Sequence, residues 1–500
     1  MLTKYFFTPP CLLAILLLLS SAAYSQSQCE STPGLHAQSM SGSISRADFE
    51  TYLEIPFNVL EGTREITVNF SYDRSERTTI DLGLLDPQGF RGWSGGNKNQ
   101  FVVTQNFATP SYNAGPIAGG VWSVLLGVPN IREGQVADYQ IELSLKCELF
   151  PEDQIAAGDR GPDWYVGDLH VHTGHSDGSC ESLLGENVPC PAYLSLEAAA
   201  REKLDFISIT EHNSVSQYAA NLELQNYFDS VLMVPGREVT TFFGHANVFG
   251  STEFIDFRLQ AGSSKNATFL HDQIDKLGAL MSINHPGSPS GEDCMGCGWV
   301  LEDTDYSKIA AMEIVNVGYV NMPRGKAHID FWEHKLNEGY KITGIGGSDN
   351  HRATRGITQP SAIGNPRTWI FANDLSVASL IEGIRSGKAY VDASGGGVRL
   401  LNFSVGEMEM GGELEVTEGP IALRLGWQSD ETLKPVVIHQ GEVLSLNNQT
   451  FDDASYRGYV DLSSLTLPGW IRVNLVDENG AIRLLANPVY LTLGKVVPVR

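Results

Sequence analysis

Strand-like and helix-like runs alternate regularly between residues 164 and 396 of this 500-residue chain. Short apolar runs such as Val166–His172 and Phe206–Thr210 are separated by helix-like runs such as Ser195–Lys203 and Val377–Arg385. This order predicts parallel strands with helical crossovers, because a parallel pair cannot be closed by a tight turn. About seven such units predict a closed β/α barrel.

The segments on both sides of this region have β character. Residues 26–150 contain short alternating runs, such as Ile66–Phe70 and Trp122–Leu126, split by Gly, Pro, Asn and Asp; they predict an antiparallel β-sandwich of jelly-roll type. A Pro- and Gly-containing linker follows, up to residue 163. Residues 397–500 predict a small C-terminal β domain. The fold class is therefore a multidomain α/β protein, as a chain of this length implies.

The first 25 residues have the pattern of a secretory signal peptide. Lys4 supplies a positive charge, Cys11 to Leu19 are almost wholly apolar, and Ala23-Tyr24-Ser25 offers small residues for cleavage. The apolar run is too short for a transmembrane helix, and no later run is long enough. We therefore expect an exported protein, periplasmic or secreted, with no membrane span.

Cysteine usage agrees with export. Six cysteines remain after removal of the signal peptide, and an even number in an exported chain favours disulfides, although six allow 15 connectivities. Proximity suggests Cys180–Cys190 and Cys294–Cys297, which leaves Cys29–Cys147. The CxxC at Cys294 has the alternatives of zinc binding or redox chemistry. Because no second CxxC completes a structural zinc site, a loop disulfide is favoured.

The charge excludes one class of partner. A formal net charge of −25 opposes binding to DNA or RNA, which requires a basic surface. The expected partner is a small molecule, and the oligomeric state is open.

Potential metal ligands gather at the ends of the expected strands of residues 164–396. His170 and His172 are two positions apart on one strand, so both point to the same face. In β/α barrels the carboxyl ends of the strands carry the chemistry. The complete set is His170, His172, Asp177, His212, Glu238, His245, His285, Asp349 and His351.

Nine imidazole and carboxylate groups exceed one tetrahedral site, so they predict two or three divalent ions. Mixed His, Asp and Glu ligands suit Zn²⁺, Mn²⁺ or Fe²⁺. A carboxylate such as Glu238 can bridge two ions about 3.5–4 Å apart, as in binuclear hydrolysis.

The motifs HxHTxxSDG, TEHN, GxE, GH, NHP and SDxH, in this order, resemble the PHP (polymerase and histidinol phosphatase) metallohydrolase family over about residues 164–395. The resemblance implies a distorted (β/α)₇ barrel. It also implies one metal on His170, His172, Glu238 and Asp349, a second on Glu238, His245 and His285, and a third on Asp177, His212 and His351. The flanking β domains are similar to those of the exported carbaryl-hydrolase (CehA/McbA) group.

Other polar residues near these motifs have less specific expectations. His175 is a candidate for substrate contact, and Glu211 for support of a ligand. Arg237, Arg352 and Arg355 could neutralise a substrate anion, or hold a carboxylate beside the site. Histidines without apparent partners are expected at the surface: His36, His271, His328, His334 and His439.

The ligand set predicts hydrolysis by a metal-bound hydroxide, because coordination lowers the pKa of water from 15.7 to about 7. The first hypothesis is a phosphoesterase acting on small phosphate esters. The alternative is a carboxylic or carbamic ester hydrolase of the CehA/McbA type. A third possibility is a catalytically idle protein that binds surface polymers; the complete set of ligands argues against it, since buried charged groups are costly without a role.

Overall fold

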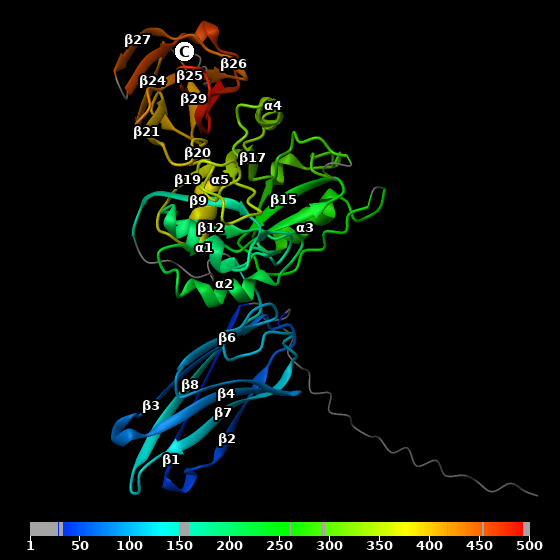
Figure 1. Ribbon diagram of the computed structural model, residues 1–500, viewed down its shortest axis with the longest axis vertical. Coiled ribbons are helices and arrows are strands. Elements are labelled where there is room, and N and C mark those ends of the chain that lie inside the picture. Colours follow the sequence, from blue (N-terminus) through cyan, green and yellow to red (C-terminus); the bar gives the residue numbers. More distant parts are fainter. Residues whose placement is uncertain are drawn as a thin grey trace, which may run out of the picture.

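The computed structural model describes residue 29 and residues 34–149, 160–260, 262–291, 294, 296–417, 419–452 and 455–493. From bottom to top in Figure 1, the chain forms a β-sandwich, a mixed central region and a C-terminal β region. The expected signal peptide and most of the expected linker lie outside the described residues. Within the described ranges, no helix is long and apolar enough to cross a membrane.

Two four-stranded antiparallel sheets form the N-terminal sandwich. One has the order β1 (Leu35–Ser45), β8 (Val136–Lys146), β3 (Glu65–Tyr72) and β6 (Gln100–Thr104). The other has the order β2 (Tyr52–Val59), β7 (Gly120–Asn130), β4 (Thr79–Asp86) and β5 (Gly89–Gly95). Alternate side chains, such as those of Ile66, Leu82 and Leu143, fill the space between the sheets.

The central region is built on two sheets that meet at the potential metal ligands. In the first, β9 (Asp163–Val171) lies between β12 (Phe206–Ile209) and β19 (Arg367–Ala372), with β13 (Leu232–Met233) and β20 (Ala389–Asp392) beyond them. The second has the order β14 (Gly236–Thr241), β15 (Gly244–Phe249), β16 (Leu280–Ile283), β17 (Ala311–Asn316) and β18 (Thr343–Gly347). Two single bridges, Val171 with Asn350 and His212 with Glu238, connect the sheets.

The helices are few and lie between the central strands. They are α1 (Ala192–Arg201), α2 (Gln217–Gln225), α3 (Ala267–Lys276), α4 (Pro323–Asn337) and α5 (Val377–Arg385). Short 3-10 helices are η2 (Arg46–Asp48), η3 (Ser75–Arg77), η5 (Tyr306–Lys308) and η6 (Leu462–Ser464).

A closed barrel of seven regular β/α units is not evident. The pairs β9–β19, β19–β20, β14–β15 and β15–β16 are antiparallel, and antiparallel neighbours need no helical crossover. Only Phe242 and Phe243 separate β14 from β15. The expected strand Leu232–Val239 is also divided into β13 and β14; Pro235, which has no N–H to donate to a sheet, lies between them.

The first central sheet continues into the C-terminal region through the pair β20–β30. Beyond β30 (Ile482–Ala486) come β29 (Gly469–Val476), β25 (Lys434–His439) and β26 (Glu442–Val443), while β31 (Val489–Leu493) pairs with β29 and β23 (Glu413–Val416) with β31. A separate sheet has the order β22 (Met408–Glu409), β21 (Val398–Val405), β24 (Ile421–Ser429), β28 (Ser455–Val460) and β27 (Asn447–Asp452). The two regions therefore share a sheet.

Two of the three suggested disulfides, Cys29–Cys147 and Cys294–Cys297, are present. The third is not, because Cys180 and Cys190 are buried free thiols. They lie together at the hairpin of β10 (Ser179–Glu181) and β11 (Asn187–Pro189). Burial and a hydrogen bond with Cys180 raise the pKa of the Cys190 thiol to about 12.

A buried ion pair joins the C-terminal region to α4. Arg472 on β29 is 1% exposed; its Nε lies 2.8 Å from Glu333 Oε1, and its Nη2 contacts the same oxygen. Its Nη1 donates to Asn474 Oδ1 at 2.6 Å. The two bonds to Glu333 thus hold α4 against the C-terminal sheet, and the bond to Asn474 orients the guanidinium within β29.

We expect Arg472→Met to lower the free energy of unfolding by about 3–5 kcal/mol, because it leaves Glu333 buried without a counter-charge. The double variant Arg472→Met/Glu333→Leu should recover much of this loss, since neither charge is then buried. Urea unfolding followed by circular dichroism measures both. Equal destabilisation of the single and double variants would contradict a role for the unpaired charge.

Candidate metal centre

Two buried histidines of the centre lie at the end of β9: His170 on the strand and His172 directly after it. His170 and His172 are each 1% exposed, and the His172 N–H donates to the Asn350 carbonyl at 2.8 Å. Asp168, two residues before His170 on β9, accepts hydrogen bonds from the backbone N–H groups of His170, Ser348 and Gly364. This carboxylate therefore ties β9 to the loop after β18, which carries Asp349.

Asp349, His170 and His172 form the first of three groups of potential ligands. Asp349 Oδ1 lies 3.3 Å from His172 Nε2 and 3.5 Å from His170 Nε2. Asp349 has a φ of +49°, a conformation that a non-glycine residue adopts at an energetic cost. Burial would raise the pKa of Asp349, but the neighbouring histidines hold it well below its usual value.

The second group is open to solvent and contains His172, Asp177, His212 and His351. Asp177 Oδ1 lies 3.2 Å from His351 Nε2, and Asp177 Oδ2 lies 3.6 Å from His212 Nε2. Burial opposes ionisation of Asp177, but the hydrogen bond from His351 and the charges of the histidines lower its pKa to about 2. The Asp177 side chain is 56% exposed, so this group lies at the mouth of the centre.

Glu238, on β14, is the carboxylate of the third group, with His245 and His285. Its Oε1 lies 3.3 Å from His245 Nδ1, 3.6 Å from His285 Nε2 and 3.4 Å from His170 Nε2. Its Oε2 lies 3.7 Å from His172 Nε2 and 2.7 Å from His212 Nδ1. Glu238 thus reaches histidines of all three groups, the position required of a bridging ligand.

The chemistry of these donors fits divalent metal ions. In the described part of the chain, His170 Nε2, both ring nitrogens of His172 and His245 Nε2 are buried without a hydrogen-bond partner. Buried polar atoms are rarely left unsatisfied. Of these nitrogens, His170 Nε2 and His172 Nε2 both face the carboxylates of Glu238 and Asp349. All nine expected ligands lie in the three groups.

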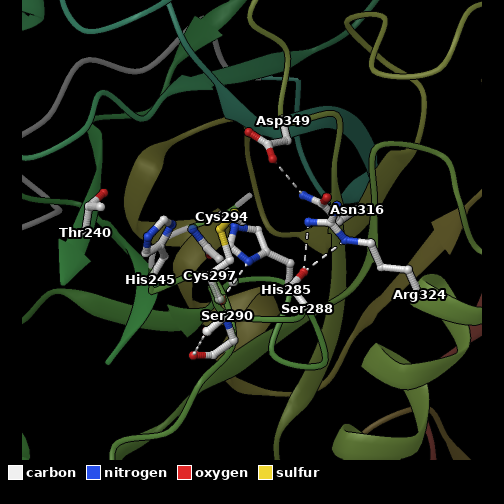
Figure 2. Close-up of a disulfide and its surroundings, with 12 residues drawn as sticks. Thr240, His245, His285, Ser288, Ser290, Cys294, Cys297, Asn316, Arg324 and Asp349 are labelled. Atoms are coloured by element: carbon white, nitrogen blue, oxygen red, sulfur yellow. Dashed lines mark hydrogen bonds between the residues drawn. A yellow bond between two sulfur atoms is a disulfide. The ribbon is translucent and has the colours of Figure 1, made fainter. Parts of the chain in front are cut away.

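Hydrogen bonds to the far side of several rings select which nitrogen faces the centre. His285 Nδ1 contacts the Cys297 carbonyl at 3.1 Å, and His351 Nδ1 contacts the Asp349 carbonyl at 3.0 Å. A carbonyl only accepts, so Nδ1 must carry the proton and Nε2 is left as the donor for a metal. Figure 2 shows His285 and His245 beside the loop of Cys294–Cys297.

Glu313 and Asn316, which the sequence analysis missed, support the ligands from β17. Glu313 is 2% exposed; its Oε1 lies 2.9 Å from His170 Nδ1, and its Oε2 accepts from the His285 N–H at 3.1 Å. Asn316 Nδ2 donates to Glu313 Oε2 and to Asp349 Oδ2 (Figure 2). A Glu within the apolar run Ala311–Val315 is the signal that could have revealed this carboxylate.

Glu211 and His175 hold the loop that carries Asp177. Glu211 is fully buried and accepts hydrogen bonds from the Thr173 N–H, the Thr173 hydroxyl and the Ser176 hydroxyl. Burial raises the pKa of Glu211 to about 7, although these hydrogen bonds oppose the shift. His175 Nδ1 contacts Ser216 Oγ at 2.8 Å. Support of a ligand, one of the expected roles of Glu211, agrees with this placement.

The three arginines expected near the substrate are placed differently. Arg237 is 1% exposed, and its guanidinium donates to the Ser214 and Glu253 carbonyls, so its expected contact with substrate does not fit. Arg355 donates to the Pro360 carbonyl. Arg352 is exposed, and no hydrogen bond or ion pair joins its guanidinium to a described ligand residue.

Arg324, near the start of α4, was not singled out by the sequence. Its Nε and Nη2 donate to Ser288 Oγ at 3.1 and 3.0 Å, and the Ser288 N–H donates to the His285 carbonyl at 2.9 Å (Figure 2). The side chain is exposed. An exposed cation therefore lies two hydrogen bonds from a ligand.

The surface assignment of three histidines is wrong. His271, His328 and His439 are 2%, 1% and 7% exposed. His328 Nδ1 accepts from the Gly287 N–H at 3.1 Å, and burial lowers its pKa to about 3. The neutral imidazole of His328 thus holds the loop after His285 against α4. No local sequence pattern predicts this contact.

Comparisons with solved structures include two similar proteins, both of low sequence identity. No protein-family model matches the chain, and no curated protein matches its sequence. A two-domain protein from Bacteroides vulgatus ATCC 8482, named as containing a predicted PHP-like metal-dependent phosphoesterase, is 17% identical with a TM-score of 0.36 and is matched over 67% of this chain and 96% of that chain. A candidate metal-dependent phosphoesterase from Bifidobacterium adolescentis ATCC 15703 is 14% identical with a TM-score of 0.28, over 43% and 94%. Function is therefore inferred from the site itself.

We expect Glu313→Ala to weaken metal binding about 10–100-fold, because it removes the partner that orients His170. The measurement is competition with a chromogenic chelator, using Zn²⁺ and the purified apoprotein. Asp392→Asn, a change at a buried carboxylate that binds Ser394 and Gly396 outside the centre, is the matched control. Unchanged Zn²⁺ affinity in the folded Glu313→Ala variant would contradict the orienting role.

Proposed function

We propose that this chain is an exported, metal-dependent hydrolase of the PHP type that acts on small phosphate esters. The observation that carries the proposal is the position of Glu238, which contacts five histidines drawn from three groups of potential ligands. Such an arrangement suits two or three divalent ions held around a shared carboxylate.

The residues that would hold the ions fall into the three groups already described. His170, His172 and Asp349 form the first, His172, Asp177, His212 and His351 the second, and Glu238, His245 and His285 the third. When bound, Zn²⁺, Mn²⁺ or Fe²⁺ would supply Lewis acidity that activates water and stabilises the charge developing on the ester. The chain's own contribution is to fix the ligands through Glu313, Asn316 and the backbone carbonyls.

Arg324 favours a phosphate ester over a neutral ester. A phosphate monoester carries negative charge, and an exposed guanidinium presents several donors to its oxygens. Arg324 is already oriented by Ser288, which is bonded to the backbone of His285. A neutral carbamate or carboxylic ester has no comparable need for this cation.

Export rests on the first 25 residues and on the disulfides. The bonds Cys29–Cys147 and Cys294–Cys297 are stable in oxidising compartments and rare in the reducing cytosol.

The test of the reaction class is a substrate panel on the full chain reconstituted with Zn²⁺, Mn²⁺ or Fe²⁺. We expect hydrolysis of aryl phosphates, loss of activity with a chelator and recovery on adding the metal back. Cleavage of naphthyl carbamates or aryl acetates with aryl phosphates left intact would overturn the phosphoesterase proposal. Less than about one equivalent of metal per chain after reconstitution would instead favour the idle binding protein.

Arg324→Ala tests substrate charge. We expect kcat/KM for an aryl phosphate to fall about 10–100-fold, the effect of losing one charge-assisted hydrogen bond of about 1.5–3 kcal/mol. Arg324→Lys should recover part of the loss, and Arg355→Ala, which removes a guanidinium bonded to the Pro360 carbonyl, should have little effect. Metal content is measured in parallel. Equal losses in Arg324→Ala and Arg355→Ala would contradict a specific anion contact.

A further inference from the structure

The outer faces of the two sandwich sheets differ in chemistry. On β1, β8 and β3 the outward positions are mainly polar, with Ser39, Ser41, Ser43, Asn69, Ser71, Asp138, Gln140 and Glu142. On β2, β7, β4 and β5 they include large apolar side chains, namely Tyr52, Pro56, Leu85, Phe90, Trp93, Val121 and Leu125. We call the second set the aromatic face.

Trp93 lies in the middle part of the aromatic face, with its ring packed directly against two glycines. A Cβ at Gly83, on β4, would lie 2.6 Å from Trp93 Cε3, and a Cβ at Gly127, on β7, would lie 2.7 Å from Trp93 Cη2. The benzo ring therefore crosses two adjacent strands at positions where any larger residue would collide with it. Two glycines in strand interiors weaken a sheet, so their use here needs a compensating packing role.

Tyr52 places a second ring beside Trp93. The ring centroids are 5.8 Å apart at an interplanar angle of 61°, and the same Cβ at Gly127 would lie 3.3 Å from Tyr52 Cε1. Tyr52 is 70% exposed, and Phe90, which lies on β5 with Trp93, is 64% exposed. Exposed aromatic side chains on a solvent-facing sheet mark a binding surface, because scattered single residues would not produce this pairing.

Carboxylates lie beside the two rings. Glu54, on β2, is the next outward residue after Tyr52. Asp81 and the indole nitrogen of Trp93 are both close to Gly95: a Cβ built on Gly95 would lie 3.7 Å from Asp81 Oδ1 and 4.0 Å from Trp93 Nε1. The one basic residue of these four strands, Arg91, is buried and paired with Asp86 at 3.1 Å. The face thus offers flat apolar rings, hydrogen-bond acceptors and an indole N–H.

We propose that the aromatic face binds a neutral polysaccharide. A pyranose ring has an apolar face of C–H groups that stacks on an aromatic ring, and hydroxyls at its edge that donate to carboxylates. The acidic groups here, with the net charge of −25, oppose a polyanion. The Trp93 ring lies against Gly83 and Gly127 beside the exposed Tyr52 ring, an arrangement that suits stacking of a sugar ring.

The test is affinity electrophoresis of the full chain in native gels that contain one polysaccharide each: hydroxyethylcellulose, xyloglucan, galactomannan, amylopectin or, as the acidic comparison, polygalacturonate. We expect retardation by at least one neutral polymer and none by polygalacturonate. Trp93→Ala and Tyr52→Ala should each weaken the retardation about 10-fold. Val136→Ala, at a 60% exposed position on the other sheet, is the matched control.

Tyr52→Ala keeps the test independent of folding, because the Tyr52 side chain is largely outside the core. No retardation by any neutral polymer, or retardation unchanged in both aromatic variants, would overturn the proposal. So would sedimentation showing that wild type self-associates and that Tyr52→Ala or Trp93→Ala abolishes the association, because a second copy of the chain would then cover the face. Hydrolysis of small esters should be unchanged in all three variants.

Discussion

The contact between the Glu238 carboxylate and five histidine rings is the constraint on which the centre depends. A carboxylate that is 1% exposed is expensive to keep ionised unless positive charge or metal ions surround it. The five histidines come from β9, β15 and the segments after β9, β12 and β16. They can surround the buried charge of Glu238 only if these strand ends meet. The two bridges between the central sheets lie at this junction, one of them at Glu238 itself. Burial alone would raise the pKa of Glu238. The neighbouring histidines outweigh this effect and hold the pKa well below its ordinary value.

The grouping of the candidate ligands was predictable from the sequence because most of them lie in or directly after a short apolar strand, and all lie within a distinctive motif. Their supporting residues were not. Glu313 is an interior residue of a strand, and its contacts to His170 and to the His285 N–H cross more than 25 positions of sequence. Arg324 is one of many arginines until α4 brings it to Ser288, and His328 is an isolated histidine until the fold buries it. Conversely, Arg237 is adjacent to Glu238 in sequence but points to the opposite side of β14, since neighbours on a strand alternate between faces.

Strand direction was the part of the fold that local patterns could not supply. The sequence of an apolar strand is the same whether its neighbour is parallel or antiparallel. The regular spacing of strands and helices therefore favoured a barrel. The short turn Phe242-Phe243 between β14 and β15 reverses the chain without a crossover, and β16 then pairs with β15 in the antiparallel sense. Of the described strand pairs in this sheet, only β16–β17 and β17–β18 are parallel. The Cys29–Cys147 pairing was suggested by elimination, because each partner lies at one end of the sandwich and sequence separation carries no information on their contact.

The two flanking regions relate to the centre in different ways. The C-terminal strands extend the sheet of β9 through β20 and β30, and their core includes residues of α4 and β17, so that they help to fix the elements that carry His170, Glu313 and Arg324. The sandwich instead touches the central region through side-chain contacts such as Asn106 Nδ2 with the Thr252 carbonyl at 2.6 Å and Arg64 with Glu253 at 3.4 Å. A region that shares a sheet and a core with the candidate centre is constrained to support it, whereas one joined to it through side-chain contacts is free to evolve a surface of its own. The aromatic face lies on the sandwich, away from the elements that carry the candidate metal ligands. The proposed polysaccharide contact is therefore physically separable from the proposed hydrolysis.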